Sequence, residues 1–291
     1  MLAYRLVALM AALAPAGMLS AHMPYVAPSL FDAGKRDHVT LEASFTEDAF
    51  RAEIAMQDAP FELTGPDGAT VRLPAPTILT DRTMVETRLP EDGIYRVSSG
   101  QRLGRLGKMV RTDGEWRMAG EDGAPPAGAI MVDVQSTTLA DAYVVRGRPA
   151  GTKALAARGH ALEIHPVRDP TAIGAGDPLP VEILQDGTPL ANTDVSLFRE
   201  AGLYDGRKIL TARTDATGRV SIKVPDAGRY LILVRNRVTA PARFAGGRCE
   251  LHDDTGVRSD RLAPVFRHEA LRYARLSPET LFSMTRSGQL N

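Results

Sequence analysis

Short alternations of apolar and polar residues recur along most of the chain, and this period of two predicts β-strands. Clear examples are HVTLEASF (38–45), LPVEILQ (179–185), RVSIKV (219–224) and RYLILVR (229–235). Turn-forming clusters separate them, among them GPDG (65–68), PEDG (90–93), QDGTP (185–189) and PDAG (225–228). Short strands joined by such turns are typical of antiparallel sandwiches rather than of parallel α/β sheets. We therefore expect an all-β protein.

A weak internal repeat refines this expectation. LPEDGIYRV (89–97) and VPDAGRYLI (224–232) share a proline, an acidic residue, a glycine and a tyrosine at matching spacing. In Ig-like sandwiches a tyrosine at such a turn packs inward while its hydroxyl bonds to the backbone. We expect this of Tyr95 and Tyr230, and we interpret the repeat as two consecutive Ig-like or prealbumin-like β-sandwich domains.

The domain limits follow from the composition of the connecting segments. The Gly- and Ala-rich stretch 146–159 resembles a linker, which divides the chain into an N-terminal sandwich (22–148) and a C-terminal one (149–291). The second resembles an Ig-like, carboxypeptidase-regulatory-like domain with a C-terminal extension. Residues 99–128 are expected to form a long polar loop. Near the C-terminus, LSPETLFSM (276–284) fits either a short helix capped by Ser277 or the last strand.

Residues 1–21 have the features of a cleaved signal peptide. A short cationic start is followed by the apolar run LVALMAALAPAGML and by small residues at Ser20 and Ala21. Cleavage after Ala21, Ser20 or Ala16 would leave His22, Ala21 or Gly17 as the first residue. No later segment is apolar enough to cross a membrane. We expect a periplasmic protein that is not embedded in the membrane.

Composition excludes several functional classes. The 35 basic and 35 acidic residues balance, which argues against nucleic acid as a partner. Cys249 is the only cysteine, so an intramolecular disulfide is impossible. The sequence contains no G-x-S-x-G elbow, H-E-x-x-H helix or phosphate-binding glycine loop. We therefore do not expect an enzyme.

Several of these segments together resemble a known family. AHMPYVAPS, VTLEASFTEDAF, PEDGIYRV, LADAYVVRGRPAG and TDATGRVSIKVPDAGRYLILV occur in the order typical of NikM-like exported proteins, over about residues 22–240. The resemblance implies a periplasmic β-rich component of nickel or cobalt uptake, with a histidine just after the signal peptide. The family's His-Pro pair is replaced here by Asp169-Pro170, while His165-Pro166 lies four residues earlier.

These observations make His22 the principal candidate metal ligand. If cleavage follows Ala21, the new α-amine and the imidazole of His22 form a bidentate chelate for Ni, Co or Cu. A second histidine would complete a three-nitrogen site, and His165 is the candidate for it, although its LEI-His-Pro context is also that of an ordinary sheet residue. The alternative for His22 is an unliganded surface residue. The polar cluster CELHDD (249–254) is interpreted as a solvated loop.

Two functions remain open. The first is a periplasmic accessory protein that binds a transition-metal ion and assists an envelope transporter. The second is a non-catalytic Ig-like interaction module of the cell envelope.

Overall fold

The computed structural model describes residues 22–112, 115–120, 123–200, 202, 209–239, 274–276 and 279–284. The signal-peptide prediction and the CELHDD cluster lie outside these residues. Strands dominate the described part, and its helical content is limited to the 3-10 turns η1 (Lys153–Leu155) and η2 (Pro170–Ala172). The expected all-β class is confirmed.

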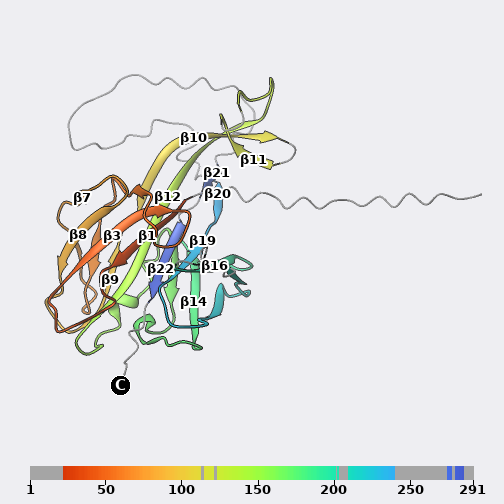
Figure 1. Cartoon of the computed structure of the whole chain (residues 1–291). Coiled ribbons are helices and arrows are strands. Elements are labelled where there is room, and N and C mark those ends of the chain that lie inside the picture. Colours follow the sequence, from red (N-terminus) through yellow and green to blue (C-terminus); the bar gives the residue numbers. More distant parts are fainter. Residues whose placement is uncertain are drawn as a thin grey trace, which may run out of the picture.

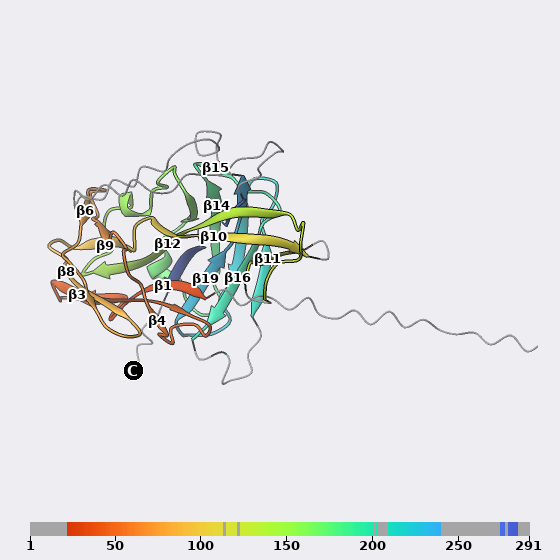
Figure 2. The same cartoon turned by 90° about the horizontal axis from the view of Figure 1, so that it is seen from above.

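The strands form three stacked layers (Figures 1 and 2). The first outer sheet is antiparallel and has the order β1-β3-β8-β7, with β4 paired to β3. Its strands are β1 (Met23–Pro28), β3 (His38–Thr46), β4 (Ile54–Ala55), β7 (Thr77–Ile78) and β8 (Thr83–Arg88).

The middle layer is an 11-stranded sheet with the main order β17-β16-β19-β22-β12-β9-β5-β6. Strands β2 and β22 run parallel to β12, and the other pairings are antiparallel. Its strands are β2 (Asp32–Gly34), β5 (Glu62–Thr64), β6 (Thr70–Arg72), β9 (Gly93–Ser98), β10 (Arg102–Thr112), β11 (Glu115–Met118), β12 (Met131–Arg146), β16 (Asp194–Arg199), β17 (Leu210–Arg213), β19 (Tyr230–Val234) and β22 (Glu279–Met284).

The third sheet covers the opposite face of the middle layer. It contains β13 (Leu162–Pro166), β14 (Pro178–Gln185), β15 (Thr188–Pro189) and β18 (Arg219–Lys223). A separate two-stranded ribbon joins β20 (Arg237–Thr239) to β21 (Ala274–Leu276).

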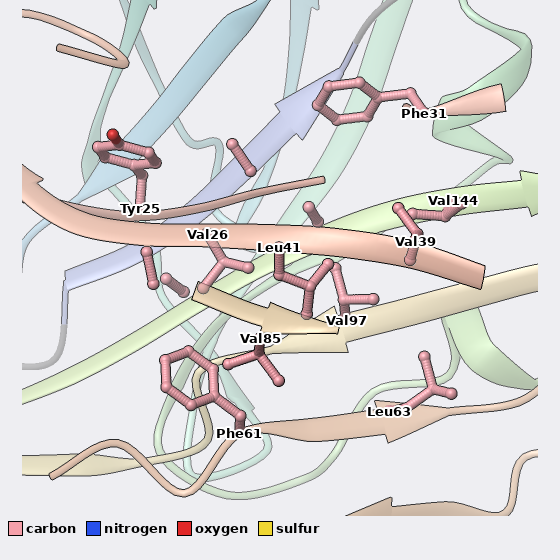
Figure 3. Close-up of a cluster of buried hydrophobic side chains, with 14 of the residues drawn as sticks. Tyr25, Val26, Phe31, Val39, Leu41, Phe61, Leu63, Val85, Val97 and Val144 are labelled. Carbon is pink, nitrogen blue, oxygen red and sulfur yellow. The ribbon is translucent and has the colours of Figure 1, made fainter. Parts of the chain in front are cut away.

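Two hydrophobic cores lie on the two faces of the middle sheet, because successive residues of a strand point to opposite faces. In β19, Leu231 and Leu233 belong to the core beneath β1 and β3, whereas Ile232 belongs to the core beneath the third sheet. Strand β12 divides in the same way, with Val144 in the first core and Tyr143 in the second. Figure 3 shows the first core. The middle sheet therefore contains strands from both sides of residue 148, the predicted boundary between the two domains. The predicted domain limits, 22–148 and 149–291, stay a prediction.

The two tyrosines of the repeat behave as the sequence predicts. Tyr95 and Tyr230 are buried. The Tyr95 hydroxyl donates to the Glu91 carbonyl at 2.7 Å and accepts from the Glu91 amide at 2.9 Å. The Tyr230 hydroxyl donates to the Asp226 carbonyl at 3.1 Å. Each hydroxyl fixes the turn four residues upstream. The repeat therefore marks two equivalent turns, one leading into β9 and the other into β19.

The interpretation of residues 99–128 as a loop is wrong for half of their length, which forms β10 and β11. β10 pairs with the first half of β12 and with β11, and together these strands form an arm that extends beyond the layered body in Figure 1. The β10 sequence LGRLGKMV (103–110) lacks a regular alternation, because its glycines at 104 and 107 and a register shift between Leu103 and Leu106 interrupt it. Near the C-terminus, the sequence left residues 276–284 as either a short helix or a strand. Residues 279–284 form the strand β22.

The segment expected to be a linker ends in a buried ionic anchor. Arg158 binds Asp141 of β12 through two hydrogen bonds of 2.5 and 2.6 Å, and it donates to the Ser98 hydroxyl at 3.0 Å. The backbone amides of Arg158 and Gly159 donate to the Glu163 carboxylate at 2.8 and 3.0 Å. Both Asp141 and Glu163 are almost completely buried. These contacts fix the end of the connecting segment to both the middle and the third sheet.

Candidate functional site

His22 lies directly before β1 and beside the loop that joins β3 to β4. The antiparallel register pairs Met23 with Thr46, so the residue before β1 lies next to the residues after β3. The His22 imidazole Nε2 is 3.6 Å from a carboxylate oxygen of Glu53 and 3.8 Å from one of Glu47. One imidazole and two carboxylates therefore converge at the first described residue of the chain.

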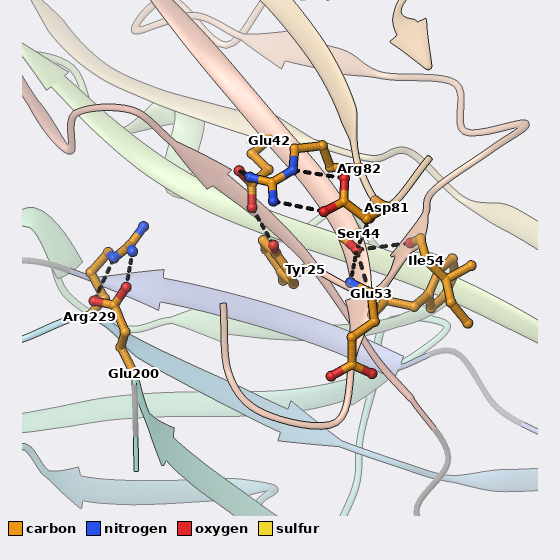
Figure 4. A network of polar contacts seen from close by, with 10 residues as sticks. Tyr25, Glu42, Ser44, Glu53, Ile54, Asp81, Arg82, Glu200 and Arg229 are labelled. Atoms are coloured by element: carbon orange, nitrogen blue, oxygen red, sulfur yellow. Dashed lines mark hydrogen bonds and ion pairs between the residues drawn. The ribbon is translucent and has the colours of Figure 1, made fainter. Parts of the chain in front are cut away.

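The loop that carries the two carboxylates is held by hydroxyl groups of β3. The Thr46 hydroxyl contacts the carbonyls of Asp48 and Arg51. The Ser44 hydroxyl lies 2.9 Å from the Ile54 carbonyl and accepts a hydrogen bond of 3.2 Å from the Glu53 amide (Figure 4). These contacts fix the backbone of Glu53, so its side chain leaves the loop from a defined position beside His22.

Phe50, at the tip of the same loop, has an unusual backbone conformation. Its φ of 66° lies in the left-handed region, which costs a residue with a bulky side chain about 1–3 kcal/mol. The ring packs edge-on against Tyr25 with centroids 5.4 Å apart, and the Arg229 guanidinium lies 5.0 Å from its centre. Residues from both halves of the chain thus hold this loop in a conformation that its own backbone does not favour.

A second polar network lies next to the loop and is already internally satisfied. The buried Tyr25 hydroxyl donates to Glu42, which also accepts a hydrogen bond of 2.8 Å from Arg82. Arg82 in turn binds Asp81 at 2.9 Å (Figure 4). Burial, followed by the hydrogen bond and the charge of Glu42, raises the pKa of Tyr25 far above its usual range. Tyr25 therefore stays a neutral donor, and Glu42 is committed to its two partners.

His165 lies far from this site in the layer order. It belongs to β13 of the third sheet, whereas β1 belongs to the first outer sheet. Its Nδ1 atom is 3.3 Å from Glu182, and the same carboxylate is 3.7 Å from Arg219. The sheet position expected for His165 is confirmed, but the structure does not bring it together with His22. Its role as a metal ligand stays a prediction.

Two acidic residues beside His22 were not recognised in the sequence. The signal that could have found them is the register of the hairpin formed by β1 and β3, since that pairing places residue 22 beside residue 47. The segment TEDAFRAE (46–53) contains three acidic residues, and only a known register separates Glu47 and Glu53 from Asp48, which is buried. Within the described residues, no group of three or more His, Cys, Asp or Glu side chains could hold a metal ion.

Comparison with known proteins identifies the family. Residues 19–238 match the model of a family described as a domain of unknown function, DUF4198. The chain belongs to the DUF4198 family. This description covers most of the chain and does not mention nickel or cobalt uptake. No curated protein matches the DUF4198 chain. Among its described residues, no helix combines the length and the apolar character needed to cross a membrane.

Several solved structures are similar to the DUF4198 chain at low identity. A DUF4785 family protein from Legionella pneumophila is 10% identical, with a TM-score of 0.24, 72% of this chain covered and 50% of that one. This chain thus spans about half the length of the Legionella protein. The D0-D1 domain of intimin is 12% identical, with a TM-score of 0.20 and coverage of 90% and 99%. A two-domain fibronectin type III segment of chicken tenascin is 12% identical, with a TM-score of 0.18 and coverage of 73% and 90%.

Proposed function

We propose that this protein is an exported, periplasmic accessory protein that binds a divalent transition-metal ion at the start of β1 and assists its uptake by an envelope transporter. The observation that carries the proposal is the convergence of His22, Glu47 and Glu53, with nitrogen-to-oxygen separations of 3.6 and 3.8 Å. The protein acts by binding rather than by catalysis. Nickel, cobalt and copper are the candidate ions, because imidazole nitrogen suits all three.

The proposed site needs a ligand beyond these three side chains, and a chain that begins at or near His22 would supply it. Metal bonds to imidazole nitrogen or carboxylate oxygen measure about 2.0–2.2 Å, so one ion can bridge atoms separated by the distances seen here. The side chains alone do not complete a site, and the missing nitrogen ligand is assigned to the α-amine, or to a backbone amide, next to His22. Glu53 is the better oxygen donor, since its backbone is fixed by Ser44 and its side chain is less exposed than that of Glu47.

Loss of the imidazole tests this proposal. His22→Ala in the exported, signal-cleaved protein is expected to weaken Ni(II) or Cu(II) binding by at least about 100-fold, because loss of an outer-shell contact alone costs about 10–100-fold and His22 would bind the ion directly. Glu53→Gln is expected to weaken binding by about tenfold. Isothermal titration calorimetry measures affinity, and native mass spectrometry reads the stoichiometry and the first residue of the same sample.

The chain offers a matched control. His38 is an exposed histidine whose Nδ1 atom lies 3.1 Å from Asp37, so it is also a histidine–carboxylate pair. Among the residues that the structure describes, no second carboxylate forms an ion pair with it. His38→Ala is expected to leave metal binding unchanged. Equal loss in the His38 and His22 variants, or full binding by the His22 variant, would show that the ion is not held at the start of β1.

A second candidate function is favoured by the arm formed by β10, β11 and the first half of β12. Leu103, Leu106 and Met131 share one face of this arm by register and are all strongly exposed, with Leu106 reaching 68%. Exposed apolar side chains gathered on a projecting element mark an interaction site more often than scattered ones do. This favours the interaction module, in which the arm contacts an envelope partner.

Site-specific photo-crosslinking in the producing cell tests the arm. A photoreactive residue in place of Leu106 is expected to give a discrete adduct with an envelope protein, whereas one in place of Ile78, equally apolar and 50% exposed on β7, is not. The adduct is identified by mass spectrometry, and the purified partner is then titrated against wild-type and Leu106→Glu protein. Equal crosslinking at both positions, or equal binding of both proteins, rules the arm out as the contact site.

A further inference from the structure

Strand β22 occupies an unusual place in the middle sheet. On one side it pairs in parallel with β12, where Thr138 to Ala142 are opposite Glu279 to Ser283. On the other side it pairs antiparallel with β19, where Tyr230 to Val234 are opposite Met284 to Thr280. Within the described residues β22 is the only strand between β12 and β19, so it joins the two halves of the sheet (Figure 1).

The two strands that border β22 are buried along the whole contact. All of residues 138–142 and 230–234 have at most 5% of their surface exposed. Without β22, the facing backbone amides and carbonyls of both strands would lose their partners in a place where water cannot easily replace them. Buried backbone groups left unpaired are strongly unfavourable. β12 and β19 therefore form a slot that requires a strand.

The strand that fills the slot is a separate part of the chain. The family match ends at residue 238, so β12 and β19 lie inside it and β22 lies outside. Residues 240–273 separate β20 from β21, and a stretch of that length can reach a neighbouring molecule when extended. The contacts that β22 makes with the slot would be the same whether the strand came from its own chain or from another.

The register defines what the slot accepts. Leu281 is opposite Ala140 on one side and Leu233 on the other, and both of these belong to the first core. Phe282 is opposite Asp141 and Ile232, and Ile232 belongs to the second core. Consecutive positions of a strand in this slot pair with residues of alternate cores, so the slot favours apolar residues at neighbouring positions, as in LF at 281–282.

We propose that β12 and β19 form a strand-binding slot, closed in this structure by the chain's own β22, and that the slot also accepts β22 from a second copy of the chain. Such an exchange is a form of strand addition and creates a dimer without any new interface. It is independent of the metal proposal, because neither the slot nor its test involves His22.

The slot is tested first in the folded, full-length chain. A protease site is introduced within residues 240–273, and the purified protein is cut after folding. The released C-terminal fragment is expected to stay bound during size-exclusion chromatography. A fluorescein-labelled peptide of residues 274–291 is expected to exchange into the cut protein at one per chain. The same peptide with Leu281→Asp is expected to bind at least about tenfold more weakly, since position 281 pairs with Ala140 and Leu233 of the first core, beside which a charge is unfavourable.

Exchange of β22 between two copies of the chain is tested with uncut protein. Two full-length preparations with different mass tags are mixed at high concentration, and native mass spectrometry is expected to detect dimers that carry both tags. A Val234→Cys/Thr280→Cys variant, made with Cys249→Ser, joins a registered pair of β19 and β22. When oxidised as a monomer before mixing, it is expected to give no mixed dimers.

Three results overturn the proposal. The first is a cut protein that stays folded by circular dichroism but binds no labelled peptide, or binds the Leu281→Asp peptide equally well. The second is peptide binding without any mixed dimers of uncut chains, which would show that only the chain's own strand enters. The third is mixed dimers of the oxidised variant, which would place the dimer contact elsewhere.

Discussion

Arg158→Ala is expected to lower the free energy of unfolding by about 3–5 kcal/mol, the usual effect of removing one partner of a buried ion pair. The substitution leaves Asp141, 2% exposed, without the two hydrogen bonds of 2.5 and 2.6 Å that Arg158 supplies. It also removes the contact to Ser98. Urea unfolding followed by circular dichroism measures the change at pH 7.

The pH dependence of the free energy of unfolding provides a second test of this prediction. Burial alone would raise the pKa of Asp141, but the charge and hydrogen bonds of Arg158 outweigh burial and hold that pKa below its usual range. The ionised pair therefore stabilises the fold above the unfolded-state pKa of about 4, and this contribution is lost as the pH falls through the lower folded-state pKa. The difference in stability between wild type and Arg158→Ala is expected to shrink in acid.

An exposed ion pair is the matched control for the anchor. Arg88 of β8 pairs with Asp37, the residue directly before β3, and the Arg88 side chain is 79% exposed. Arg88→Ala is expected to change stability by less than about 1 kcal/mol, because solvent screens such pairs. If the two arginine variants were equally stable, the buried pair would not act as an anchor.

Leu231→Ala is expected to destabilise the protein by about 2–5 kcal/mol, the range for removing a large aliphatic side chain from a tightly packed core. Leu231 is fully buried and comes from β19, yet it packs in the core beneath β1 and β3. Its loss is therefore expected to weaken both halves together, so that differential scanning calorimetry shows one transition shifted to lower temperature.

Leu210 of β17 provides the comparison for Leu231. It lies in the same sheet and is 43% exposed, so Leu210→Ala is expected to change stability by no more than about 0.5 kcal/mol. Two separate calorimetric transitions, with Leu231→Ala shifting only one of them, would show that the halves unfold independently despite the continuous sheet.

The sequence contained the local features of this fold but not its long-range pairings. Tyr95 and Tyr230 could be placed because each hydroxyl bonds to a carbonyl only four residues away. The pairing of β22 with β12 joins residues that are more than a hundred positions apart, and no local pattern specifies it. The arm was missed for another reason. Its glycines read as loop residues, although β12 supplies a full strand partner.

The candidate site was predictable only in part, for a similar reason. His22 could be singled out because its chemistry depends on the nearby cleavage site. Glu47 and Glu53 become neighbours of His22 only through the register of β1 on β3, which pairs Met23 with Thr46. The separation of His22 from His165 depends on which sheet each strand joins, and strand alternation alone does not reveal the order of layers.

The sharing of β12 and β19 between two cores restricts how this chain can change its length. In a sandwich with one core, a one-residue insertion in a strand exchanges a buried face for a solvent-exposed one. Here both faces are buried, so the same insertion would push Tyr143 and Val144, or Leu231 and Ile232, into the wrong cores at once. Natural length variation should therefore be confined to the turns and to the tip of the arm, while these two strands keep a constant number of residues.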